Sequence, residues 1–137
     1  MTPMAANPAY PGLYGLQVFV VEDEAMISMM LEDMLADFGC TLAGVAATVS
    51  DALNQVNATP AIDAAILDVN LGGEKIFPVA DILALRNVPF VFSTAYGPDG
   101  LSERYPTRPL LRKPYAPEAL ASALMALTRL QPELSAP

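Results

Sequence analysis

The sequence predicts an α/β fold in which helices cover both faces of a doubly wound, five-stranded parallel sheet, giving a three-layer sandwich. Short apolar runs alternate along the chain with longer segments whose apolar residues recur at helical spacing. The runs contain almost no polar residues, which is typical of parallel strands that are buried on both faces. Because crossovers between parallel strands are right-handed, helices are expected on both sides of the sheet.

Composition narrows the class of protein. The chain has 137 residues, which fits one domain, and 53% of them are hydrophobic, enough for a sizeable core. Its net charge of −8 argues against binding to nucleic acid or to an anionic membrane. It has no histidine, which excludes serine–histidine and cysteine–histidine nucleophiles. Cys40 is the only cysteine, and neither a signal peptide nor a membrane-spanning run is visible, so a cytoplasmic location is expected.

The chain begins with a segment that has no periodic pattern. Residues 1–15 contain three prolines and two glycines and are predicted to form a flexible leader. A buried strand is predicted over 18–21, and a helix over 25–38 follows it and ends before Gly39. The helix has one apolar stripe, which consists of Ile27, Met30, Leu31, Met34, Leu35 and Phe38.

The middle of the chain predicts two further strands and the helix between them. The second strand is expected over 41–47. Thr48 and Asp51 form a capping box that opens the next helix, and Pro60 closes this unit. The third strand is expected over 64–67.

A turn at 70–73 leads into the third helix. Its apolar residues run from Ile76 to Leu83, and it is expected to end near Arg86. The fourth strand is predicted over 89–93.

The C-terminal part of the chain predicts an irregular segment, a short strand and a long helix. Residues 97–109 contain two glycines and three prolines, so the fourth helix is expected to be short or irregular. The fifth strand covers 110–112, and Pro117 opens the final helix. Residues 131–137 are predicted to be a frayed tail, which bounds the domain at 16–130. The stripe of the final helix is Leu120, Ala123, Leu124, Leu127 and Leu130.

Polar residues follow four of the predicted strands. These residues are Asp23, Asp68, Thr94 and Lys113. The carboxyl ends of parallel strands meet at one edge of the sheet, where such folds bind ligands. Each residue also has an ordinary structural interpretation, because Asp23 is a natural N-cap and the others could simply end a strand. Their joint occurrence at four strand ends favours a site.

The acids at this edge favour a hard cation. Glu22 adds a third carboxylate to Asp23 and Asp68, and three converging carboxylates resist ionising together unless a cation relieves the repulsion. Ligation by oxygen alone suits Mg²⁺. A P-loop NTPase would also place an Asp after an apolar strand, but the chain lacks the glycine–lysine segment that such a site needs. The Lys113–Pro114 bond can adopt the cis form, which would fix the direction of the lysine.

These segments resemble the CheY-like receiver domain of two-component response regulators over about residues 16–130. The matching segments are VVEDE with Glu22 and Asp23, ILDVN with Asp68 and Asn70, STA with Thr94 and Ala95, and RKPY with Lys113 and Pro114. The stretch PFVFSTAYG further resembles the single-domain FAT GUY subgroup of alphaproteobacteria. The resemblance implies the flavodoxin-like strand order 2-1-3-4-5.

The resemblance also implies a function. Asp68 would accept a phosphoryl group from a sensor histidine kinase or a phosphotransfer protein, with Lys113 and Thr94 binding the phosphoryl oxygens. Mg²⁺ would be held by Asp23, Asp68 and the backbone carbonyl of Asn70, with Glu22 acting directly or through water. The chain would then signal to a downstream protein or act as a phosphate sink. It is also expected to form a weak homodimer. It would catalyse only its own phosphorylation and dephosphorylation, and direct control of transcription is not expected.

Three positions concern the switch between states. Leu110 replaces the aromatic residue that many receivers carry three positions before the lysine, and Tyr96 is a candidate substitute. The small Ala95 leaves room for the phosphoryl group. Phosphorylation is expected to reposition residues 97–109 through Thr94 and Tyr96. Gly72 and Gly73 stand where the family usually has a proline, so that loop is expected to be more mobile.

Two other functions remain open on the sequence alone. The chain could be a pseudo-receiver, an interaction module that never takes phosphate, although the intact acids, Thr94 and Lys113 argue against this. It could also be a Mg²⁺-dependent phosphohydrolase with an aspartyl-phosphate intermediate, but Asp68 is not followed by the second Asp and the Thr that such enzymes use.

Overall fold

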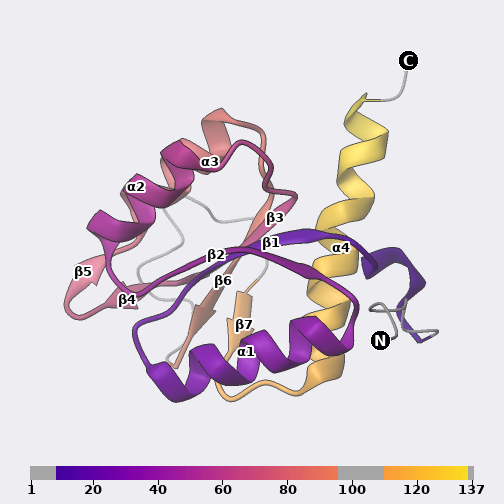
Figure 1. Cartoon of the computed structure of the whole chain (residues 1–137), viewed down its shortest axis with the longest axis horizontal. Coiled ribbons are helices and arrows are strands. Elements are labelled where there is room, and N and C mark those ends of the chain that lie inside the picture. The colour runs from indigo at the N-terminus through magenta and orange to yellow at the C-terminus, as the bar shows by residue number, and fades with distance from the viewer. Residues whose placement is uncertain (1–8, 96–109, 136–137) are drawn as a thin grey trace, which may run out of the picture.

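The protein is a three-layer α/β sandwich (Figure 1). The computed structural model describes residues 9–95 and 110–135, and of residues 70 and 129–135 it describes the backbone only. The parallel sheet has the order β2-β1-β3-β6-β7. Its strands are β1 (Gln17–Val21), β2 (Thr41–Ala46), β3 (Ala64–Asp68), β6 (Phe90–Thr94) and β7 (Leu110–Arg112). These are the five predicted strands in the predicted order, so the fold class is confirmed.

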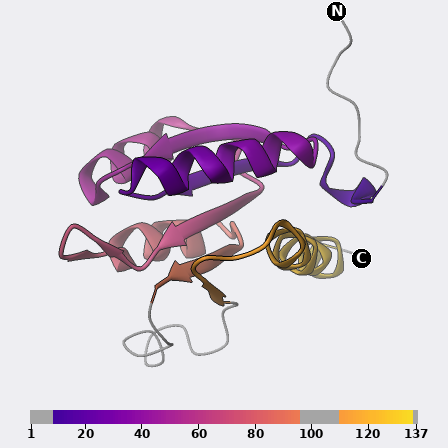
Figure 2. The same ribbon diagram turned by 90° about the horizontal axis from the view of Figure 1, so that it is seen from below.

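Helices cover both faces of the sheet. They are α1 (Ala25–Asp37), α2 (Val49–Ala58), α3 (Phe77–Leu85) and α4 (Pro117–Ser135). Helices α2 and α3 lie together on one side in Figure 1, and α1 lies on the other. Figure 2 shows the molecule from below, with α1 from the side and α4 end-on. The segment where a short or irregular fourth helix was predicted, 97–109, lies outside the described residues.

Two hydrophobic clusters explain why the strands read as unbroken apolar runs. Phe19, Phe90 and Phe92 point toward α2 and α3, whereas Val18 and Val20 belong to the cluster beneath α1 and α4. Successive side chains of a strand point to opposite faces, so a sheet covered on both sides needs apolar residues at every position.

Residues 9–15 are the described part of the segment predicted as a flexible leader, and they are packed; residues 1–8 lie outside the described residues. A 3₁₀ turn, η1 (Pro11–Leu13), contains the fully buried Leu13. The Tyr10 ring lies 4.9 Å from that of Phe38, and the Gly15 N–H donates to the Gly39 carbonyl at 2.8 Å. A single 3₁₀ turn is too short to show a periodic pattern. Tyr10 and Leu13 hold the segment in place, but two such residues among prolines and glycines form no pattern that the sequence could reveal.

The helices differ from prediction at three points. In α1, Ser28 is buried and Met30 is 48% exposed, so the buried face is rotated from the predicted stripe toward Ser28, Leu31 and Leu35. The N-cap of α1 is Glu24 rather than Asp23. Helix α4 extends to Ser135 rather than fraying after residue 130. Nothing in the described residues explains why the helix continues through Pro132, since a proline is unfavourable in a helix interior.

Other local predictions agree with the structure. The Thr48 hydroxyl accepts from the Asp51 N–H at 3.1 Å and caps α2 as predicted. Gly39 follows α1 with a φ of 85°, a conformation that favours glycine. Within residues 9–95 and 110–135, no helix combines the length and the hydropathy needed to cross a bilayer.

A two-stranded antiparallel hairpin, β4 (Asn70–Leu71) and β5 (Glu74–Lys75), occupies the segment predicted as a turn. Gly72 and Gly73 form its tip, with φ values of 55° and 90° that other residues adopt with strain. The hairpin begins two residues after Asp68 and therefore lies beside the carboxyl edge of the sheet.

Candidate functional site

The parallel register brings the predicted polar residues to one edge of the sheet. Val21 pairs with Leu67, so Glu22 directly follows β1 beside Asp68, the last residue of β3. Asp68 pairs in turn with Ser93, and Thr94 pairs with Arg112. Thr94 thus ends β6 next to Lys113, which follows β7.

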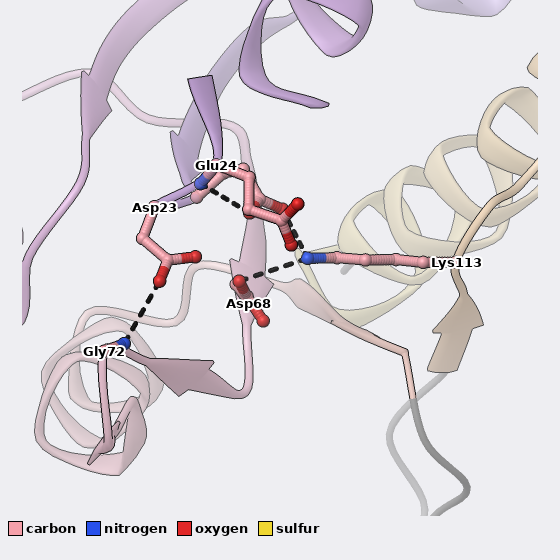
Figure 3. A network of polar contacts seen from close by, with 6 residues as sticks. Asp23, Glu24, Asp68, Gly72 and Lys113 are labelled. Carbon is pink, nitrogen blue, oxygen red and sulfur yellow. Dashed lines mark hydrogen bonds and ion pairs between the residues drawn. The ribbon is translucent and has the colours of Figure 1, made fainter. Parts of the chain in front are cut away.

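One ammonium joins two buried carboxylates. Lys113 Nζ lies 2.7 Å from Glu22 Oε1 and 3.1 Å from Asp68 Oδ2. The three side chains are only 8%, 1% and 7% exposed, respectively. Figure 3 shows the lysine reaching across from β7 to Asp68. Since a buried charge without a partner is strongly unfavourable, Lys113 allows at least one of the two acids to remain ionised.

Asp23 has a different role from the N-cap that the sequence suggests. Its side chain is exposed, and its Oδ2 accepts from the Gly72 N–H at the tip of the hairpin at 3.1 Å (Figure 3). The start of α1 is instead held by Glu22, whose Oε2 accepts from the Glu24 N–H at 3.1 Å. Helix α1 begins at Ala25, as predicted, so its N-cap is Glu24, and Asp23 lies one residue before the cap.

The electrostatics of the site centre on Asp68. Burial, and then the negative charge of Glu22, raise the pKa of Asp68 to about 7, while Lys113 partly opposes them. Burial by itself lowers the pKa of Lys113, but its contacts with Glu22 and Asp68 outweigh this and raise that pKa, so the lysine is charged at neutral pH. One positive charge therefore faces two buried acids and the nearby Asp23.

This donor set fits a divalent cation. Carboxylate oxygens of Glu22, Asp23 and Asp68 lie within 4.8 Å of one another. A carboxyl group whose pKa is raised by a neighbouring acid is one that an added cation would stabilise in its ionised form. Glu22 already contacts Lys113 and the Glu24 N–H, which leaves Asp23 and Asp68 facing an open cavity of about 250 Å³.

The remaining predicted residues fall into three groups. Thr94, which is 7% exposed, and the exposed Ala95 line the same cavity. Asn70 starts β4 next to the site, and Leu110 is half-buried against the hydrophobic cluster on the α2 and α3 side. The Lys113–Pro114 bond is cis. Tyr96 lies outside the described residues.

Sequence reasoning missed three residues that line the cavity: Glu24, Gly72 and Gly73. The paired glycines did signal a tight turn, but nothing in the sequence indicated that a hairpin would bring its tip back to Asp23. Glu24 also lines a neighbouring apolar groove of about 240 Å³ between α1 and the segment 113–115. The groove shares Ala95 and Lys113 with the cavity, and its apolar wall consists of Ile27, Met30, Leu31, Met34, Pro114 and Tyr115.

Known proteins share this fold and are similar to the chain in sequence. The chain is similar to SdrG from Sphingomonas melonis Fr1, with 49% identity, a TM-score of 0.74 and coverage of 82% of this chain and 96% of SdrG. The PhyR response regulator REC domain of Erythrobacter litoralis is 31% identical, with a TM-score of 0.73, and 92% of it is covered. The BeF3-activated conformation of SdrG from Pseudomonas melonis Fr1 matches at 50% identity, with a TM-score of 0.71 and 95% of that chain covered.

A longer relative matches over part of its length. The chain is 29% identical over 111 residues to the phyllosphere-induced regulator PhyR of Methylorubrum extorquens. The match covers 79% of this chain but only 42% of that regulator. No family model matches the chain. The identity to SdrG and to the REC domain over nearly their whole lengths, together with the shared fold, shows that the chain belongs to the receiver domains of response regulators.

Proposed function

We propose that the chain is a phospho-receiver that takes a phosphoryl group onto Asp68. The observation that supports this most strongly is a buried carboxylate at the end of β3, 3.1 Å from a lysine ammonium and facing a cavity lined by Asp23 and Thr94. A nucleophile, a cation for the phosphoryl oxygens and a hydroxyl donor thus share one cavity.

The reaction follows from these groups. The Asp68 carboxylate attacks the phosphorus of a phosphohistidine, the P–N bond breaks, and the imidazole of the donor leaves with that electron pair. Since the chain has no histidine, the donor is another protein or a small phosphorylated molecule. Lys113 would shift its contact from the Asp68 carboxylate to a phosphoryl oxygen, and the Thr94 hydroxyl would donate to another.

The cofactor expected at this site is Mg²⁺. Asp23, Asp68 and the Asn70 carbonyl would hold the ion, with Glu22 contributing directly or through water. When bound, Mg²⁺ would neutralise charge on the phosphoryl oxygens. The residues of the chain bring the acids together, keep Lys113 charged between two of them, and hold Asp23 against the hairpin.

The apolar groove beside the cavity supports a protein as phosphodonor. It adjoins the cavity at Glu24, Ala95 and Lys113, and the exposed Met26 and Met29 continue the apolar surface along α1. A sensor histidine kinase or a phosphotransfer protein in the cytoplasm is the proposed donor, and a downstream protein is the proposed receiver of the signal. The proposed chemistry is limited to the chain's own phosphorylation and dephosphorylation, without turnover of a separate substrate.

A test uses acetyl phosphate as donor and intact-mass spectrometry as readout. The protein is expected to gain one phosphoryl group with Mg²⁺ and none with EDTA. Asp68→Asn should abolish the adduct, and Asp33→Asn, which removes an exposed acid of α1, should not. Absence of an adduct with any small phosphodonor or kinase would favour the pseudo-receiver, whereas an adduct that persists in Asp68→Asn would place the chemistry elsewhere.

A further inference from the structure

Two buried hydroxyls next to the site have no hydrogen-bond partner among the described residues. They are Ser93 Oγ and Tyr115 Oη. Ser93 is 1% exposed and directly precedes Thr94, and Tyr115 follows Lys113 by two residues. A buried hydroxyl without a partner is unfavourable, because it has lost its hydrogen bonds to water without replacing them.

The two hydroxyls lie on the same side of the sheet. Ser93 is two residues after Val91, which belongs to the hydrophobic cluster beneath α1 and α4, so its side chain points to that face. Tyr115 packs against the same cluster. The Ser93 hydroxyl lies near enough to act on the pKa of Tyr115, yet the pair does not meet hydrogen-bond geometry.

Tyr115 keeps its proton at neutral pH. Burial raises its pKa to about 12, and the charge of Glu22 adds to the rise, although Ser93 opposes it. The phenol is therefore a hydrogen-bond donor throughout the physiological range.

The chain connects these hydroxyls to the two groups that would bind the phosphoryl oxygens. The Lys113 N–H donates to the Thr94 carbonyl at 2.8 Å, which ties the end of β6 to the segment after β7. Because Tyr115 follows Lys113 by two residues, a movement of Lys113 relative to β6 would also move Tyr115 relative to Ser93.

We propose that Tyr115 and Ser93 are a positioning pair, whose hydrogen bond is completed when the phosphoryl group draws Lys113 and Thr94 inward. This inference rests on the proposed function. A bond made in only one of two conformations shifts their equilibrium toward that conformation. The pair therefore favours the phosphorylated form by satisfying two hydroxyls that the free form leaves unpaired.

Beryllofluoride with Mg²⁺, a mimic of the phosphoryl group, tests the proposal without turnover. Its apparent affinity is measured for the unmodified protein, Ser93→Ala, Tyr115→Phe and the double variant. Each single change is expected to weaken binding about three- to tenfold, the range of one hydrogen bond. The double variant should be no weaker than either single variant, because both changes remove the same bond.

Matched controls separate this bond from general packing. Ser50→Ala removes an exposed hydroxyl, and Tyr10→Phe removes the hydroxyl of a ring that packs edge-on against Phe38. Both residues lie away from the site, so both variants should leave the affinity unchanged. In the NMR spectrum, a slowly exchanging Tyr115 hydroxyl proton should appear with beryllofluoride and be absent in Ser93→Ala. This signal does not depend on how well the Tyr115 variant folds.

The outcomes also separate the two proposals. The positioning pair is wrong if both single variants bind beryllofluoride as tightly as the unmodified protein. It is also wrong if the loss of affinity in the double variant is the sum of the two single losses. In either case the proposed function stands. If the unmodified protein binds no beryllofluoride in the presence of Mg²⁺, both are overturned.

Discussion

Lys113 is the residue on which the charges of the site depend. It lies between Glu22 and Asp68, and both contacts are almost fully buried. The sequence identified all three residues, because strand ends in a parallel sheet converge at one edge. It could not identify the Glu22–Lys113 ion pair, since the choice of counter-ion depends on side-chain conformations that no pattern encodes. The N-cap interpretation of Asp23 was wrong, because α1 begins at Ala25 and its N-cap is therefore Glu24.

The raised pKa of Asp68 predicts that its charge destabilises the metal-free fold. Folding raises this pKa from its ordinary range to about 7. The free energy of unfolding therefore falls as the pH rises from about 4 toward 7, and the full cost of the buried charge is present above pH 7. Asp68→Asn should therefore increase the free energy of unfolding at pH 7.5 by about 2 kcal/mol, and by less at pH 5. Lys113 keeps Glu22 as its counter-ion in this variant.

Urea unfolding in EDTA at the two pH values measures this effect. The unmodified protein and Asp33→Asn, which changes an exposed acid on α1, are the references. A loss of stability in Asp68→Asn at both pH values would contradict the account.

Asp23 is the acid most available to a cation, because it is exposed whereas Glu22 is held by Lys113 and the Glu24 N–H. Asp23→Asn should weaken Mg²⁺ binding by at least tenfold, since it removes one charged ligand and keeps an oxygen that can accept from Gly72. Titration calorimetry or Mn²⁺ relaxation measures the change, and Asp33→Asn serves as the control. Equal Mg²⁺ affinity in the unmodified protein and Asp23→Asn would show that the acids at this edge do not hold the ion as proposed.

At the scale of elements, sequence patterns located every strand of the parallel sheet and each described α-helix, but they failed where elements are shorter than one period. The η1 turn contains three residues, and each strand of the β4–β5 hairpin contains two. Such segments have no periodicity, and their positions are set by contacts with distant residues, such as Tyr10 with Phe38 and Gly72 with Asp23. The start of α2 was predictable because its cap is local in sequence, from Thr48 to Asp51.

The packed N-terminal segment predicts a measurable contribution to stability. Leu13→Ala should lower the free energy of unfolding by about 2–4 kcal/mol, because the side chain is fully buried and its removal leaves a cavity. Leu85→Ala, at a position that is 84% exposed, is the matched control and should change the stability by less than about 0.5 kcal/mol. Urea unfolding monitors both variants. A loss in Leu13→Ala no larger than that in Leu85→Ala would support the flexible leader predicted from the sequence.

At the scale of the molecule, two hydrophobic clusters on opposite faces of one sheet leave its carboxyl edge free for chemistry. The unbroken apolar runs predicted a parallel sheet covered on both faces, and the strand order was implied by the resemblance to receiver domains. The buried face of α1 could not be predicted from the sequence, since Ser28 is buried while Met30 is 48% exposed beside the groove. A helix that carries apolar residues almost all round does not reveal which of them face a partner rather than the core.

The central claim, that the phosphoryl group resides on Asp68, is tested most directly by trapping the acyl phosphate. Borohydride reduces an aspartyl phosphate to homoserine, and peptide mass spectrometry then locates the reduced residue. After incubation with acetyl phosphate and Mg²⁺, homoserine is expected at position 68 and at no other acid, with none in the EDTA control. Homoserine at Asp23 or another aspartate, or none anywhere although an intact-mass adduct is present, would contradict it.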